Sequence, residues 1–167
     1  MPGHTLVRVT ATETDVPVDE RLCVALYQAA HAMESAHRPL LRGHGLTYPQ
    51  FTVLAVLDQE GAASVTAVGR RLGLTSSTLS PLLQRLEQQG RVERVRSTED
   101  ERSVVVSLTA DGRRVAEAVR EVPVRITAAA GLAADEQAAL VDTLRRLAER
   151  LRAADLTAED AGSAATA

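Results

Sequence analysis

The chain has 167 residues, of which 45% are hydrophobic and 25% charged, a composition that fits one globular domain with appendages. Its single cysteine excludes an internal disulfide, and its net charge of −3 excludes a chain that is basic throughout. No apolar stretch approaches the roughly 20 residues that span a bilayer, and the first residues do not resemble a signal peptide. We therefore expect a cytoplasmic protein without membrane contact.

Positive charge is nonetheless concentrated in one segment. Every basic residue is an arginine, and the range 70–102 holds seven arginines against five acidic residues, whereas the remainder holds twelve against seventeen. A local excess of this kind is expected where only one face of a protein meets phosphate. This segment is the first candidate for a nucleic-acid contact.

The first elements in chain order are a polar arm and two helices. We expect residues 1–16 to form a flexible N-terminal arm because they lack a helical period. From residue 18 to 43 apolar residues recur at helical spacing until glycines interrupt them. A second helix is expected next, capped by Thr47, with Pro49 in its first turn and Gly61 after its last.

Two shorter helices follow, joined by a tight turn. The first covers residues 64–73 and ends in glycine. The second covers 76–89: the hydroxyl residues from Thr75 onward supply its N-cap, and Gly90 ends it. Two helices separated by so short a turn are typical of a helix-turn-helix.

A β-hairpin is expected over residues 92–108. The strand residues alternate at first and then become β-branched, and a polar turn at 97–103 lies between them. A helix-turn-helix followed directly by such a hairpin is a winged helix. The expected fold class is therefore mainly α with a small β-hairpin wing, that is, a winged helix-turn-helix with a helical dimerisation region.

The last part of the chain predicts two more helices. One covers about 109–129, kinked at Pro123, and the other covers about 135–156 with a narrow leucine stripe. Together with the first helix they carry more apolar surface than one winged helix can cover, so we expect a homodimer. We assign residues 46–108 to a DNA-binding lobe, 17–45 and 109–156 to the helical dimerisation region, and 157–167 to a disordered tail.

The helix at 76–89 is expected to enter the major groove of operator DNA. Its N-terminus can offer amide groups to a phosphate, Gln84 can read adenine and Arg85 can read guanine. Arg85 can instead pair with an acidic residue such as Glu87 or with a residue across the domain, and both alternatives stay open. The predicted contacts from this helix are Ser76, Ser77, Thr78, Ser80, Gln84 and Arg85.

The hairpin tip supplies the remaining predicted DNA contacts, Arg96, Asp100 and Arg102. An arginine at this place can enter a narrow minor groove, where the potential is most negative, and Asp100 can orient Arg102 through a charge-assisted pair. The alternative is a solvated charged turn. The position of the hairpin directly after a helix-turn-helix favours the DNA contact. If the protein is a homodimer, its operator is expected to be pseudo-palindromic.

From about residue 22 to 123 the sequence resembles the MarR family of winged-helix repressors, and within it the organic hydroperoxide sensors of the OhrR group. The helix and wing motifs are shared widely in that family, whereas Leu22-Cys23 with Leu26-Tyr27 and Thr47-Tyr48-Pro49-Gln50 are more specific to the hydroperoxide sensors. The widely shared motifs are TLSPLLQRLEQQG (78–90) and STEDERSVVVSLTADG (97–112), and the resemblance also rests on LCVALYQAAHAM (22–33), RPLL (38–41) and LTYPQF (46–51).

The resemblance implies that Cys23 is a peroxidatic thiol near the N-terminal end of the first helix. It implies that tyrosine hydroxyls, largely from the other subunit, hold its thiolate. Tyr27 and Tyr48 stand at matching positions, and His37 replaces a residue that is often tyrosine. An organic hydroperoxide is expected to oxidise Cys23 to a sulfenic acid. With no second cysteine, this acid either forms a mixed disulfide with a low-molecular-weight thiol or over-oxidises irreversibly, and the operator is released. No cofactor is implied.

Other functions stay open at this point. A lone cysteine on an apolar helical face is usually an inert small hydrophobe, so a repressor responding to a phenolic or aromatic ligand, with Cys23 structural, is the alternative. We expect no metal site, because His31, Glu34, His37 and His44 match no strong ligand spacing. We also expect no enzyme, because no catalytic constellation or phosphate loop is present.

Overall fold

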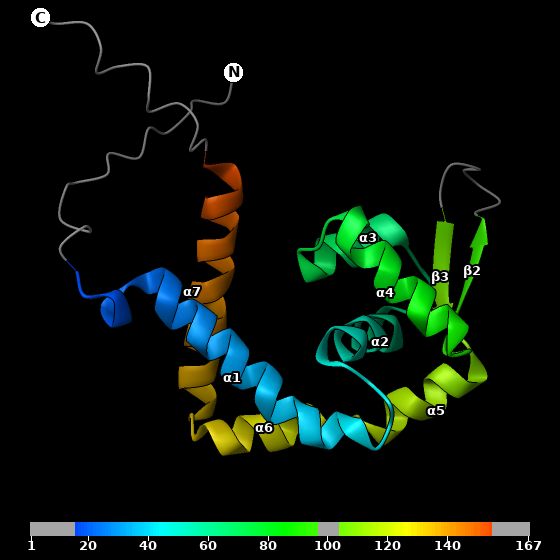
Figure 1. Ribbon diagram of the computed structural model, residues 1–167, viewed down its shortest axis with the longest axis horizontal. Coiled ribbons are helices and arrows are strands. Elements are labelled where there is room, and N and C mark those ends of the chain that lie inside the picture. Colours follow the sequence, from blue (N-terminus) through cyan, green and yellow to red (C-terminus); the bar gives the residue numbers. More distant parts are fainter. Residues whose placement is uncertain (1–15, 97–103, 155–167) are drawn as a thin grey trace, which may run out of the picture. The chain divides into compact units, whose positions relative to one another are not determined.

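The computed structural model describes residues 16–96 and 104–154. They form two compact units: the described residues up to Ala25 and from Ala130 onward, and Leu26–Ala129. Figure 1 labels the elements apart from η1 and β1. In chain order they are a 3-10 helix η1 (Val18–Glu20), α1 (Leu22–Arg42), α2 (Tyr48–Glu60), β1 (Ala63–Ser64), α3 (Val65–Leu72), α4 (Ser76–Gln88), β2 (Val92–Arg96), β3 (Val104–Leu108), α5 (Ala110–Ala118), α6 (Val122–Ala130) and α7 (Ala134–Ala153). The expected winged helix-turn-helix fold class is confirmed. Within the described ranges no helix is long and apolar enough to cross a membrane.

Helix starts are fixed by short-range capping. Thr47 caps α2 in a full capping box, in which its side chain accepts from the Gln50 amide and the Gln50 side chain accepts from the Thr47 amide. Ser64 and Thr75 cap α3 and α4 through the same accepting geometry. These hydroxyl residues satisfy amide groups that a helix otherwise leaves without a partner.

The helix-turn-helix consists of α3 and α4. Gly73 ends α3 in the left-handed conformation, at φ 67°, and the Leu74 amide donates to the Gly69 carbonyl at 2.9 Å. A side chain at Gly69 would lie 2.9 Å from the Leu74 carbonyl oxygen, so glycine permits this close turn. The core of this lobe lies between α2, α3, α4, α5 and the sheet, and its fully buried side chains are Leu41, Leu54, Leu57, Leu79, Leu83, Leu86, Val53, Val68 and Val106.

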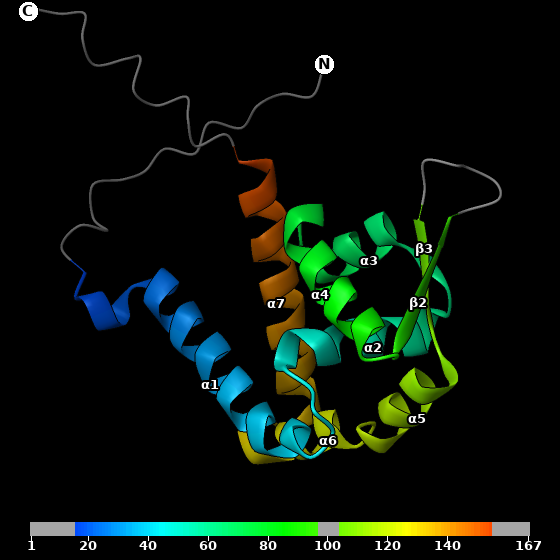
Figure 2. The ribbon, with the colours of Figure 1, turned by 45° about the vertical axis from the view of Figure 1, so that its right-hand side comes forward.

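The wing is an antiparallel pair of strands extended by a third. β2 and β3 pair from Val92–Leu108 to Arg96–Val104, and β1 joins the other side of β3, giving the order β1-β3-β2. The sequence predicted the hairpin and missed β1, which is only two residues long. Figure 2 shows the hairpin beside the C-terminal end of α4, which places the wing next to the helix-turn-helix.

The helix expected over 109–129 is wrong as a single kinked helix, because α5 ends at Ala118 and α6 begins at Val122. Pro123 has no amide hydrogen, and its ring collides with the carbonyl four residues earlier, so a continuous helix is broken at that point. In the first turn of α6 its missing hydrogen costs nothing. The last helix ends at Ala153 instead of Leu156.

The predicted arm and tail lie almost wholly outside the described residues, and the predicted division into lobe and dimerisation region stays a prediction.

The start of α5 is hydrogen-bonded to the turn between α4 and β2. The Thr109 hydroxyl donates to the Gly90 carbonyl at 2.6 Å, and the Thr109 amide donates to the Arg91 carbonyl at 3.1 Å. The Arg91 guanidinium in turn donates to the carbonyls of His44 at 2.6 Å and Gly45 at 3.2 Å. Arg91 therefore ties the turn before the wing to the turn before α2.

Candidate nucleic-acid interface and thiol site

One face of α4 is buried and the other is polar and exposed. Leu79, Leu83 and Leu86 are at most 1% exposed and anchor the helix to the lobe. Because they recur at spacings of three and four, the remaining positions point outward. All six residues of α4 that the sequence predicted as DNA contacts are exposed: Ser76, Ser77, Thr78, Ser80, Gln84 and Arg85.

The N-terminal turn of α4 is rich in hydroxyl groups and has no acidic residue. The Thr75 hydroxyl lies 2.8 Å from that of Ser77 and 3.0 Å from that of Thr78, and it also accepts from the Thr78 amide at 3.4 Å. No carboxylate in this turn neutralises the positive end of the helix dipole. The arrangement suits a phosphate group.

Arg85 is exposed in the last turn of α4. The alternative that it pairs with Glu87 is wrong, because Glu87 pairs with Arg94 of β2 at 3.7 Å. Among the residues that the structure describes, Arg85 makes no ion pair. Its side chain lies on the exposed outer face of the helix.

On the wing, Arg94, Val95 and Arg96 are all exposed on β2, and Val95 is 59% exposed. Arg96 thus lies where the prediction needs it, at the end of β2, whereas Asp100 and Arg102 lie outside the described residues. Sequence reasoning did not single out Arg94. Strand alternation gave no signal for it, because Arg94 lies two residues after the buried Val92 and so on the same face of β2.

Arg70 and Arg71 lie at the end of α3, a few residues before α4, and both are exposed. The sequence analysis used them only as part of the local positive charge. Arg71 forms an ion pair with Glu60 of α2, and a hollow lined by Glu60, Ala67, Arg70 and Arg71 lies beside it. Arg70 makes no ion pair within 16–96 and 104–154. It adds a positive charge to the lobe that the sequence alone could not orient.

Cys23 lies in the first turn of α1 and is exposed. That turn contains no acidic residue. Tyr27 follows one turn later on the same helix, is 72% exposed, and stacks on His31 with ring centroids 6.2 Å apart. The thiol and this phenol therefore share one face of α1 and are both accessible in the single chain.

His37 and Tyr48 are brought together at the junction of α1 and α2. The His37 ring is 4% exposed, and its centroid lies 4.7 Å from that of Tyr48 and 5.5 Å from that of Phe51. His37 Nδ1 lies 2.7 Å from the Met33 carbonyl oxygen. Since a carbonyl can only accept, Nδ1 carries the hydrogen, and in the neutral ring Nε2 is an acceptor.

The pKa of Tyr48 is raised above 10.0, chiefly because burial disfavours the phenolate and secondly because the Glu34 carboxylate repels it. Tyr48 therefore stays a neutral hydrogen-bond donor throughout the physiological range. Since the unfolded state releases this proton first, its contribution to stability is present below pH 10 and is lost as pH rises through the folded pKa.

This shift is measurable by absorbance titration of a Tyr27→Phe protein, in which Tyr48 is the only tyrosine. We expect the tyrosinate midpoint above pH 10.0, and we expect Glu34→Gln to lower it. A midpoint at or below 10.0 in the folded protein would contradict the burial of this phenol.

The histidines considered as metal ligands lie in separate environments. His31 stacks on exposed Tyr27, His37 is buried against Tyr48, and the His44 carbonyl accepts from Arg91. In the described part of the chain, no group of three His, Cys, Asp or Glu residues could hold a metal ion.

Comparison with known proteins places this architecture in a family. The family described as transcriptional regulator SarA/Rot matches residues 36–119. The HTH-type transcriptional regulator TtmR of Methylorubrum extorquens (strain PA1) is 41% identical over 152 residues, which are 91% of this chain and 78% of that protein. The organic hydroperoxide resistance transcriptional regulator of Bacillus subtilis (strain 168) is 37% identical over 134 residues, which are 80% of this chain and 91% of that protein.

Among solved structures, that of reduced AbfR bound to DNA is similar with a TM-score of 0.68 and 34% identity, covering 78% of this chain and 93% of that chain. The resemblance to MarR-type regulators that the sequence indicated is confirmed. The chain therefore belongs to the SarA/Rot family of winged-helix transcriptional regulators of the MarR type, and it is a DNA-binding regulator rather than an enzyme.

Proposed function

We propose that this regulator is a homodimeric repressor that leaves its operator when an organic hydroperoxide oxidises Cys23. The observation that carries the proposal is an exposed cysteine in the first turn of α1, one turn before an exposed tyrosine, in a chain 37% identical to an organic hydroperoxide resistance regulator. The end of a helix where the thiol lies favours negative charge, which a reactive thiolate needs.

In this proposal the outer face of α4 enters the major groove. The hydroxyl groups of Ser76, Ser77, Thr78 and Ser80 and the free amides of the first turn hold phosphates, which set the position of the helix on the duplex. Gln84 and Arg85, which are exposed about two turns after the start of α4, read base edges. Arg96, with Asp100 and Arg102 of the following segment, places the wing in the minor groove.

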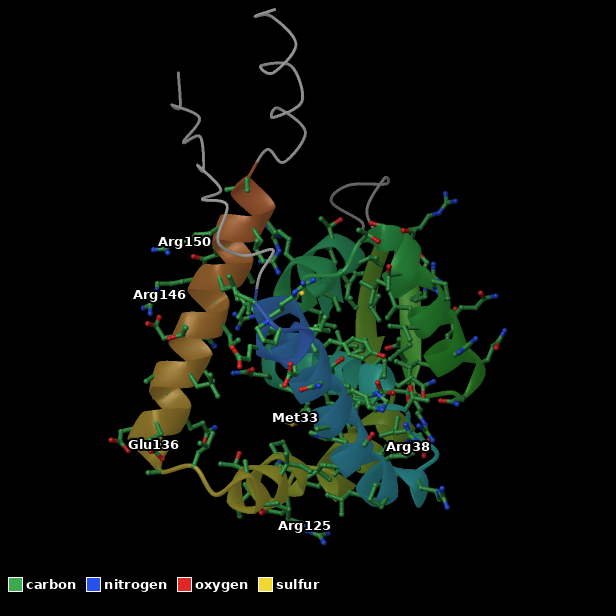
Figure 3. The ribbon with its side chains drawn as sticks, turned by 60° about the vertical axis from the view of Figure 1, so that its left-hand side comes forward. Met33, Arg38, Arg125, Glu136, Arg146 and Arg150 are labelled. Carbon is green, nitrogen blue, oxygen red and sulfur yellow. The ribbon has the colours of Figure 1, made fainter. Side chains whose placement is uncertain are left out.

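A second copy of the chain is needed to cover α7. This 20-residue helix has no buried residue, and Leu140, Leu144 and Leu151 are 40–56% exposed along one line of it. Arg146 and Arg150 extend together from a side of α7 that the leucines do not occupy (Figure 3). An amphipathic helix with a bare apolar line is stabilised by a partner, and two-fold pairing gives a pseudo-palindromic operator.

The proposed chemistry begins with attack of the Cys23 thiolate sulfur on the terminal oxygen of the hydroperoxide. The O–O bond breaks, the sulfur becomes a sulfenic acid, and the alkoxide takes up a proton and leaves as an alcohol. A low-molecular-weight thiol then displaces hydroxide from the sulfenic acid. This step forms a mixed disulfide and releases water.

Three side chains are proposed to support the thiolate before oxidation, with the tyrosine hydroxyls coming largely from the other subunit of the dimer: Tyr27, Tyr48 and His37. The raised pKa of Tyr48 keeps its hydroxyl a donor, and His37 packs against that phenol and fixes its ring. The mixed disulfide is larger than the thiolate and no longer accepts hydrogen bonds from the tyrosine hydroxyls. The first helix then repacks, and the two α4 helices leave the spacing of about 34–36 Å that adjacent half-sites require.

Mass spectrometry of the intact protein tests the chemistry separately from DNA binding. After cumene hydroperoxide and N-acetylcysteine we expect one adduct of the thiol, which dithiothreitol removes and which Cys23→Ser does not acquire. A repressor that responds to a phenolic or aromatic ligand, with Cys23 structural, would show no such adduct. That result would overturn the redox proposal and leave the DNA-binding surface untouched.

A further inference from the structure

Pro81 is the residue in α4 that a helix tolerates least. It is the sixth residue of the helix, beyond the first turn in which proline is accepted, and it offers no amide hydrogen to the Ser77 carbonyl. Proline is also the least favourable residue in a helix interior. Helical preference therefore does not account for Pro81, and the helix nevertheless continues to Gln88.

Packing does not account for it either, because Pro81 is exposed. Its neighbours on the helix surface, three and four positions away, are Ser77, Thr78, Gln84 and Arg85, which are all exposed and polar. The buried leucines of α4 lie on the opposite side. Pro81 is thus a wholly apolar ring at the centre of the outer face, and within α4 no other exposed side chain is wholly apolar.

We infer that Pro81 is a specificity-determining residue whose ring contacts the 5-methyl group of a thymine in the operator. Thymine is the base that presents an apolar group at the major-groove edge, and an apolar side chain gains by covering it. Polar residues that read other base edges or phosphates surround the ring, so the ring falls where one base edge is read. The inference rests on the proposed entry of α4 into the major groove.

The test uses duplexes selected from a randomised library by the wild-type protein. Each thymine is replaced in turn by deoxyuridine, which pairs identically and lacks only the methyl group. For wild type we expect one position in each half-site where this replacement weakens binding about fourfold, the change that corresponds to one buried methyl-sized group. Pro81→Ala is expected to lose that thymine preference.

A second variant separates the apolar contact from the shape of the helix. Pro81→Val restores the missing amide hydrogen while keeping an apolar side chain, and it is expected to retain a preference for thymine over uracil. Equal loss of affinity for thymine and uracil duplexes in both variants would assign Pro81 to helix shape and overturn the inference. An equal thymine preference in wild type and Pro81→Ala would overturn it as well.

The failure of this inference is distinguishable from failure of the proposed DNA surface. If Gln84→Ala and Arg85→Ala weaken binding but the thymine preference does not depend on Pro81, the surface stands and the inference falls. If those two variants bind the selected duplexes like wild type, α4 does not read DNA and both fall. Circular dichroism checks that Pro81→Ala and Pro81→Val keep the native helical content.

Discussion

A Cys23→Ser protein is expected to hold its operator at concentrations of cumene hydroperoxide that release the wild type. Coupling between an effector site and a binding site typically changes affinity about 5- to 150-fold, and we expect the oxidised wild type to weaken within that range. Serine replaces one exposed atom in the first turn of α1, so the fold is unaffected. Fluorescence anisotropy with labelled operator, with and without dithiothreitol, measures the change.

Met33 provides the matched control for this experiment. It lies on the same helix, is 42% exposed, and has a thioether that peroxide also oxidises. Met33→Leu is expected to respond to hydroperoxide like wild type. If Cys23→Ser releases DNA at the same dose as wild type, the thiol is not the sensor, and loss of the response in Met33→Leu would then identify the thioether instead.

Among glycine-to-alanine substitutions in the lobe, Gly112→Ala is expected to cause the largest loss of stability. A Cβ atom at this position would lie 1.9 Å from the Arg91 carbonyl oxygen, which is backbone and cannot rotate away. Alanine's better helix propensity is worth at most about 1 kcal/mol. Overpacking outweighs it, and we expect a net loss of about 3 kcal/mol.

Urea unfolding followed by circular dichroism measures this loss. Gly43→Ala is the control, because a Cβ at Gly43 would meet nothing within 4 Å, and it is expected to change stability by less than about 0.5 kcal/mol. Gly112→Ala should also weaken DNA binding, since the start of α5 holds the turn between α4 and the wing through Thr109. Equal stability of the two alanine variants would contradict the close approach at Gly112.

The elements that the sequence predicted well are those whose signals are local. Capping by Thr47, Ser64 and Thr75 involves residues three apart, so the starts of α2, α3 and α4 could be placed from the residues alone. The outward face of α4 followed from the spacing of its leucines. The helix-turn-helix and the hairpin were therefore predictable in order and in extent.

The features that the sequence did not predict depend on contacts between distant residues. β1 is two residues long and exists through pairing with Val106 and Val105, more than 40 positions away. Glu87 pairs with Arg94 across the α4–β2 turn, which sequence spacing alone could not choose over Arg85. For Pro123, proline chemistry permits both a kink and a break, and only the course of the chain between α5 and α6 decided between them.

In the thiol site, the sequence predicted the residue types and not their surroundings. His37 was predicted only as the replacement of a residue that is often tyrosine, and the structure shows it buried against the rings of Tyr48 and Phe51 with Nδ1 bound to the Met33 carbonyl. Burial of this kind depends on how α1 meets α2. It has no signature in the residues of either helix.

The most direct test of the account is duplex binding by two charge-matched variants, Arg85→Ala on α4 and Arg114→Ala on α5, where Arg114 is exposed and pairs with Asp111. Each removes one positive charge, so the net charge of the protein is the same in both. We expect Arg85→Ala to weaken binding to selected duplexes about 5- to 150-fold and Arg114→Ala to bind like wild type. Equal affinities of the two variants would contradict a DNA-reading role for the outer face of α4.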